Sequence, residues 1–189
     1  MNFINSQYIT SQMTHLTPEE GYDGMKKNGI KIIDRGRDAL LYKPPGFWIS
    51  LDGDWEEWCT SEEFRDVQNE TICDVYLKPN LTFIRISTVE DANELMAFLV
   101  PELHRYRYME NYFPLSDLLT ISKYQIHELQ KGNFITARKV WANALESCDG
   151  IYYENSGDLH FHTLFNTWDC SSIMLFDPRN VIITKQSYL

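Results

Sequence analysis

With 189 residues, of which 43% are apolar and 14% aromatic, the chain can bury one substantial core, and this composition excludes an intrinsically disordered protein. The 27 acidic residues outnumber the 17 basic ones and leave a net charge of -10, which disfavours binding to nucleic-acid phosphates or to an anionic membrane surface. A protein or a small molecule is therefore the favoured binding partner.

The chain shows no sequence signal for a membrane segment or for export. No stretch approaches the roughly 20 apolar residues of a membrane-spanning helix, and the N-terminal MNFINSQYIT lacks the charged and apolar regions of a signal peptide. We expect one domain over residues 1–189, no membrane contact and a cytoplasmic location. The cysteines lack C-x-x-C spacing, so they are expected to be free thiols rather than a zinc ribbon or a redox pair.

Two short segments near the N-terminus carry side chains suited to ligand binding. In residues 13–18 (MTHLTP), His15 and Thr17 lie on one face if the segment is a strand. Residues 41–50 (LYKPPGFWIS) predict an aromatic strand. A His beside a Thr is more often a structural pair, and a strand Trp is by default a core residue. Residues 55–59 (WEEWC) predict the beginning of a helix behind this strand.

The middle of the chain predicts an α+β pattern. Residues 71–77 and 81–86 are expected to be strands joined by a turn at residues 78–80. Residues 88–98 predict a helix with a capping box, in which Thr88 is the N-cap and Asp91 replaces the usual Glu. This helix is expected to end before Pro101.

Two further helices are expected between the middle and the C-terminal part of the chain. The aromatic and basic residues 104–108 (HRYRY) fit a surface helix better than an RNA-binding stripe, because the whole chain is acidic. Residues 136–145 (TARKVWANAL) repeat apolar side chains at helical spacing, which predicts an amphipathic helix.

Residues 147–185 predict two short strands separated by a polar break. The first strand covers residues 151–153 and ends at the polar residues 155–158. The second covers residues 172–176 and is closed by Asp177-Pro178. A carboxylate beside such a strand pair could stabilise a developing positive charge, as cleavage of an N-glycosidic bond requires.

This C-terminal stretch resembles the ADP-ribosyltransferase-like domains of phage proteins and polymorphic toxins. Their run is similar to YDGI-x-Y-x-N-x-x-E, a spacer and S-x-x-x-FDP-x-x-I. Residues 148–151 (CDGI) match YDGI apart from the first residue, and Tyr153 and Asn155 fall on the next motif positions. Asp158 stands where the family has Glu, and the spacer of residues 159–171 is longer than the simplest pattern.

The resemblance implies an ADP-ribosyltransferase-like split β-sheet with flanking helices, and NAD as the substrate. In such a domain, His15 and Thr17 would hold a ribose of NAD in the manner of the family's H-x-T motif. Trp48 or Tyr42 would stack on the nicotinamide, and Ser50 would be the family's strand hydroxyl.

For the catalytic carboxylate, the resemblance favours Asp158, then Glu154, then Asp169. The expected function is that of an NAD-dependent mono-ADP-ribosyltransferase of phage or toxin type. It would modify a macromolecular target, with a protein favoured over a nucleic acid. An NAD glycohydrolase and a catalytically inactive binding or inhibitor module on the same fold are the alternatives.

Other polar side chains could bind a metal or the pyrophosphate of NAD. His160 and His162 would share one face of a strand and could, with a nearby carboxylate, form a metal-dependent hydrolase site. The usual third-ligand pattern is missing, so no metal is expected. Local groups such as Arg35, Arg37 and Lys43 would have to bind the pyrophosphate, because the overall field of the protein is negative.

Overall fold

The computed structural model describes residues 1–32, 44–105, 141, 143, 145–161, 165 and 168–186. These residues combine helices with an eight-stranded mixed sheet, which confirms the expected α+β class. The strands are β1 (Asn2–Asn5), β2 (Met13–Thr17), β3 (Phe47–Leu51), β4 (Thr71–Leu77), β5 (Thr82–Ile86), β6 (Gly150–Tyr153), β7 (Ser172–Leu175) and β8 (Val181–Lys185). The helices include α1 (Glu19–Asn28), α2 (Asp54–Ser61), α3 (Val89–Arg105) and the short 3-10 helix η5 (Asp158–Phe161).

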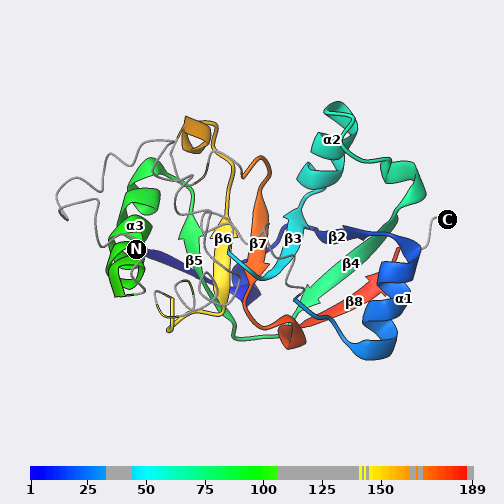
Figure 1. Cartoon of the computed structure of the whole chain (residues 1–189), viewed down its shortest axis with the longest axis horizontal. Coiled ribbons are helices and arrows are strands. Elements are labelled where there is room, and N and C mark those ends of the chain that lie inside the picture. Colours follow the sequence, from blue (N-terminus) through cyan, green and yellow to red (C-terminus); the bar gives the residue numbers. More distant parts are fainter. Residues whose placement is uncertain are drawn as a thin grey trace.

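The strands of the described residues follow the order β1-β5-β6-β7-β3-β2-β4-β8. The pair β5 and β6 is parallel and the other neighbouring pairs are antiparallel. A parallel pair needs a crossover connection, and α3 lies in the chain between β5 and β6. Figure 1 shows α3 beside β5 and β6 at one end of the molecule, and α1 beside β4 and β8 at the other.

The sheet opens between β2 and β3. These two strands pair only at Met13↔Leu51 and Thr14↔Ser50. By contrast, β2 pairs with β4 over the whole of Thr14 to Thr17, and β3 pairs with β7 over the whole of Phe47 to Ser50. Beyond Thr14 and Ser50, β2 and β3 therefore diverge, and each keeps its outer partner (Figure 1).

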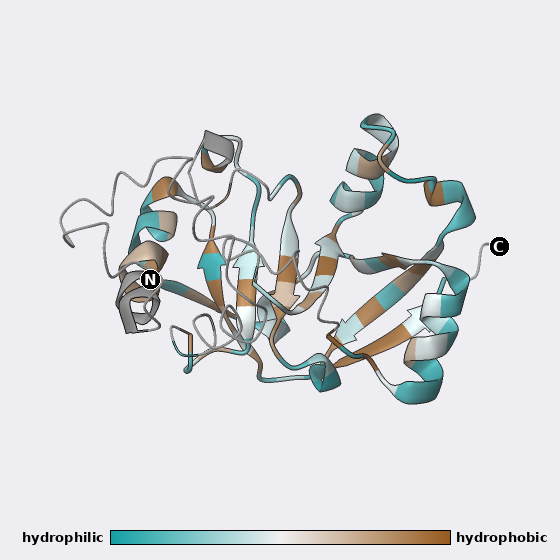
Figure 2. Ribbon diagram, viewed as in Figure 1, coloured by the Kyte–Doolittle hydropathy of each residue, from teal (hydrophilic) through white to brown (hydrophobic). Residues whose placement is uncertain are grey.

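Alternating side chains of the central strands bury both faces of the sheet. On β5, Ile84 and Ile86 join a core cluster that includes Leu95 of α3, whereas Phe83 joins a second cluster. The second cluster contains buried residues of β3, β4, β6, β7 and β8. Its members come from strands on both sides of the opening, so this core holds the two parts of the sheet together. Figure 2 shows the hydrophobic bands on the strands and the mostly hydrophilic surface of α1.

Most of the elements expected in the described residues are confirmed, with one correction. The strands at residues 71–77 and 81–86, the helix after Ser50 and the C-terminal strand pair are all present. The helix α3 continues to Arg105 and does not end before Pro101. Proline removes one helical hydrogen bond, and the buried Leu95 and Leu99 anchor the turns that precede it. Of the helix expected at residues 136–145, Trp141 and Asn143 are helical and most of the rest lies outside the described residues.

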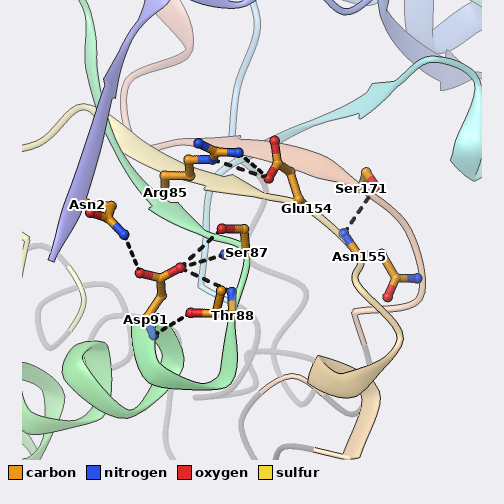
Figure 3. Close-up of polar contacts among 8 residues, drawn as sticks. All are labelled: Asn2, Arg85, Ser87, Thr88, Asp91, Glu154, Asn155 and Ser171. Carbon is orange, nitrogen blue, oxygen red and sulfur yellow. Dashed lines mark hydrogen bonds and ion pairs between the residues drawn. The ribbon is translucent and has the colours of Figure 1, made fainter.

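The predicted capping box begins α3 and ties it to the first strand (Figure 3). The Asp91 backbone N–H donates to the Thr88 hydroxyl at 3.1 Å, and the Asp91 carboxylate accepts from the Thr88 N–H at 3.1 Å. Asn2 of β1 donates to the same carboxylate at 2.8 Å, and Ser87 donates through its N–H and its hydroxyl. Burial alone would raise the pKa of Asp91, but these hydrogen bonds hold it below its ordinary value.

We predict that Asp91→Asn destabilises the fold by about 1–3 kcal/mol, because an amide cannot accept all the hydrogen bonds that converge on this buried carboxylate. Urea unfolding followed by circular dichroism measures the loss. Glu90→Gln is the matched control, since Glu90 lies in the same helical turn and is exposed. Equal stability of the two variants would contradict the structural role of Asp91.

Gly150 sits where β6 comes too close to β7 for any side chain. A Cβ atom at this position would lie 1.9 Å from the carbonyl oxygen of Met174. We predict that Gly150→Ala costs at least about 2 kcal/mol of unfolding free energy. Gly24 in α1 has open space around it, so Gly24→Ala is expected to stabilise by about 0.5–1 kcal/mol. Thermal unfolding of both variants tests the contrast, and a neutral Gly150→Ala would show that the two strands can separate there.

Candidate functional site

His15 lies where β2 and β3 diverge. Its Nδ1 is 2.9 Å from the backbone oxygen of Trp48, a residue of β3. A carbonyl oxygen can only accept a hydrogen bond, so Nδ1 carries the proton and Nε2 is left as an acceptor in the neutral ring. The ring also contacts Phe47, with centroids 4.5 Å apart.

Burial favours this neutral form. Desolvation lowers the pKa of His15 below its ordinary value of 6.5, while the bond to the Trp48 carbonyl and the carboxylate of Glu56 act in the opposite direction. His15 therefore presents a hydrogen-bond acceptor rather than a positive charge at neutral pH. Such a nitrogen suits a ligand hydroxyl better than a phosphate.

Glu56 of α2 holds the paired ends of β2 and β3. Its two carboxylate oxygens accept from the hydroxyls of Thr14 at 2.6 Å and Ser50 at 2.8 Å. The Ser50 oxygen also accepts from the Trp55 N–H at 3.0 Å. Because the Ser50 hydroxyl already donates its proton to Glu56, it has a structural role in this arrangement and does not donate a hydrogen bond to a ligand.

Aromatic side chains connect Trp48 with the core. Trp48 meets Trp168 edge-on, with centroids 4.8 Å apart and an interplanar angle of 77°. Trp168 in turn contacts Tyr153 at 5.1 Å and Phe165 at 4.8 Å. These contacts fix the orientation of Trp48 from one side, which is what a stacking platform requires.

Asp169 belongs to a segment that is held on both sides. The amide of Asn155 donates to the Asp169 carbonyl at 2.7 Å, and the Asn155 N–H donates to the Ser171 hydroxyl at 3.2 Å. From the other side, the Asp54 carboxylate accepts from the Ser171 N–H at 3.2 Å. The motif residue Asn155 thus positions the backbone that carries Asp169.

A cavity of about 570 Å³ lies at the opening between β2 and β3. Its volume falls within the roughly 300–1,000 Å³ of small-molecule sites. The wall brings together expected site residues from three distant segments of the chain, among them His15, Thr17, Trp48, Ser50 and Asp169. Trp168 also lines it.

The other two candidate carboxylates lie elsewhere. Asp158 begins η5, is exposed and does not line the cavity, whereas the catalytic role that the resemblance implies for it would require it to lie in one cleft with His15, Trp48 and Ser50. Glu154 pairs with Arg85 at 2.8 Å on the β5–β6 surface (Figure 3) and does not line the cavity either. Among the described residues of the wall, Asp169 is the one carboxylate.

Several expected ligand groups lie outside the described residues, namely Tyr42, Arg35, Arg37, Lys43 and His162. The backbone of His160 lies in η5, not in a strand, so the alternation of side chains that would place it beside His162 does not apply there. Within the described part of the chain, no group of three or more His, Cys, Asp or Glu side chains could hold a metal ion. All four cysteines are free.

The sequence alone did not single out three polar residues of this region. Arg65 and Lys31 supply positive charge to the cavity wall, and Arg65 is paired with Glu70 at 2.5 Å. Glu56 braces two strands from the first turn of α2. The available sequence signal for Glu56 was its place in the first turn of the helix that follows the Ser50 strand, but its second partner, Thr14, lies far away in the chain.

The free energy of unfolding should depend on pH in a way that shows whether His15 is neutral in the folded protein. Its pKa is lower in the folded protein than in the unfolded chain, so as the pH falls below 6.5 the unfolded chain takes up the proton first and stability is lost. We expect the unfolding free energy of the wild type to fall between about pH 7 and 5 more steeply than that of His15→Gln. Urea unfolding over a pH series measures it, and parallel curves would show that His15 is not held neutral by burial.

Comparisons with protein-family models, curated protein sequences and solved structures give no match for this chain. Among the described residues, no helix has both the length and the apolar character needed to cross a membrane. The function must therefore be inferred from the site: a cavity with a neutral histidine acceptor, a fixed aromatic ring, two cations and one carboxylate in its described wall.

Proposed function

We propose that the protein binds NAD in the cavity between β2 and β3 and transfers the ADP-ribosyl group of NAD to a macromolecular target. A protein is the favoured target. The observation that carries the proposal is the meeting of His15, Trp48 and Asp169 at one cavity, although they come from three separate segments. His15 and Trp48 lie in segments that resemble motifs of the ADP-ribosyltransferase-like domains, and Asp169 lies in the spacer between the two C-terminal motifs.

Three parts of NAD, namely a ribose, the nicotinamide and the pyrophosphate, find chemically matched groups in the wall. The Nε2 acceptor of neutral His15 suits a ribose hydroxyl, and Thr17 lies two positions along the same strand. The ring of Trp48, supported by Trp168, suits the planar nicotinamide. Lys31 supplies positive charge for the pyrophosphate, and Arg65, although paired with Glu70, adds further hydrogen-bond donors to the wall.

Asp169 is the carboxylate that we assign to the reacting ribose. Cleavage of the bond between the ribose carbon and the nicotinamide nitrogen releases neutral nicotinamide with the bonding electron pair and leaves positive charge on the sugar. A fixed carboxylate stabilises that charge, and Asn155 and Asp54 hold the Asp169 segment in place. An acceptor nucleophile then bonds to the ribose carbon and releases its proton to solvent. If water is the nucleophile, the same site acts as an NAD glycohydrolase.

The second candidate function is a binding module that holds the ligand without cleaving it. Two observations favour it: Ser50 commits its hydroxyl proton to Glu56, and Asp158 at the family's Glu position is exposed and off the cavity. Such a protein would bind NAD and release no nicotinamide. Binding and cleavage measured on the same preparation separate the two functions.

We predict that Asp169→Asn lowers the rate of nicotinamide release by about a hundredfold or more, because it removes a charge that acts mainly in the transition state. Asp158→Asn and Glu154→Gln are the matched controls and should keep most of the activity, since neither side chain lines the cavity. The assay is incubation with labelled NAD and a cell lysate, followed for free nicotinamide and for labelled protein.

Thermal unfolding of the three variants shows whether each remains folded. Full activity of a folded Asp169→Asn would refute the assignment of this carboxylate. NAD binding by the wild type without any nicotinamide release would instead establish the binding module. Release of free ADP-ribose without labelled protein would establish the glycohydrolase.

A further inference from the structure

Three aromatic rings gather on α2 and the turn after it, beside the cavity. Trp55 and Trp58 are stacked, with centroids 5.0 Å apart and an interplanar angle of 13°. Phe64 contacts both rings, at 5.9 Å from Trp55 and 5.2 Å from Trp58. We call these three residues the α2 aromatic cluster. Figure 1 shows α2 standing at the upper margin of the molecule, beyond the end of β3.

The cluster faces solvent in part. Phe64 is 61% exposed and both tryptophans are partly exposed, whereas Cys59 on the same helix is buried. The helix therefore anchors itself through its Cys59 side and leaves apolar rings at the surface. Single exposed apolar residues are common, but rings grouped in contact with one another mark interaction surfaces more often.

The surroundings of the cluster are strongly acidic. Residues 52–66 contain seven carboxylates and one cation, Arg65, which is already paired with Glu70. Glu62 follows Trp58 by one helical turn and Glu63 precedes Phe64, and both carboxylates are exposed. Aromatic faces attract guanidinium and ammonium groups, and flanking carboxylates add a second attraction to the same groups. The charge of this surface thus fits a basic partner and repels an acidic one.

The cluster is also continuous with the candidate site. Trp55 belongs to the cluster and lines the cavity as well. The Trp55 N–H donates to Ser50, which lies on the cavity wall. A partner seated on the cluster would therefore lie at the edge of the space in which we place the ligand.

We infer that the α2 aromatic cluster, with Glu62 and Glu63, docks an arginine-rich or lysine-rich segment of the protein that accepts the ADP-ribosyl group. The docking follows from the rings and charges of this surface, and the role of the segment as acceptor rests on the proposed function. Recognition combines cation–π contacts to Trp58 and Phe64 with ion pairs to the two carboxylates.

Binding of a short arginine-rich peptide to the full chain, measured by tryptophan fluorescence and calorimetry without NAD, tests the docking. A peptide with citrulline in place of arginine keeps the shape and removes the charge. We expect Phe64→Ser and the pair Glu62→Gln with Glu63→Gln each to weaken binding of the arginine peptide by at least about threefold. The matched controls are Phe3→Ser, at a 55% exposed phenylalanine of β1, and the pair Glu20→Gln with Asp23→Asn on exposed positions of α1.

Equal weakening by the α1 and α2 charge pairs would refute the inference, because attraction would then come from the whole acidic surface. Equal binding of the citrulline peptide, or no loss in Phe64→Ser, would refute it too. Nicotinamide release by the same variants without peptide separates this inference from the proposed function, since Phe64, Glu62 and Glu63 do not line the cavity. Selective loss of peptide binding supports the docking surface even if the wild type cleaves no NAD.

Discussion

The divergence of β2 from β3 is the constraint on which the candidate site depends. Two neighbouring strands that stop pairing leave backbone groups without their ladder partners, and buried groups of this kind must be satisfied in another way. The ring of His15 does this by donating to the Trp48 carbonyl. This bond leaves the second ring nitrogen, Nε2, as a hydrogen-bond acceptor. The contact that satisfies the Trp48 carbonyl therefore also determines which kind of ligand group His15 can bind.

Helix α2 stabilises the opening from outside the sheet. Glu56 joins the last paired residues of the two strands, Thr14 and Ser50, at the point where pairing ends. Two residues earlier, Asp54 holds Ser171 beside the start of β7. One short helix therefore fixes three strands relative to one another. The outer side of this helix carries the partly exposed rings of the α2 aromatic cluster.

Local patterns predicted most of the described elements. Alternating apolar residues and turn residues indicated β4 and β5, and the Thr88 and Asp91 pair indicated the beginning of α3. Elements of this kind follow from interactions between residues close in the chain. The sequence also led to His15 and Trp48, both of which line the cavity.

Spacing in the sequence could not show which of the three candidate carboxylates lines the cavity. Asp158 fits the motif count, yet it begins a separate helical turn at the surface. Asp169 lines the cavity, where Asn155 holds its backbone carbonyl and Asp54 holds the nearby Ser171 N–H. These contacts join residues far apart in the chain, and no local pattern encodes them. The use of the Ser50 hydroxyl by Glu56 likewise depends on how α2 packs against the sheet.

The attachment of Asp169 has an evolutionary consequence. Its segment is held by Asn155 on one side and by Asp54 on the other, and these contacts keep it beside the start of β7. We therefore expect the spacer that precedes this segment to tolerate insertions or deletions while Asp169 keeps its place next to β7. The number of residues between Asp169 and β7 would then be the spacing to look for in diverged sequences, rather than the number of residues between β6 and Asp169.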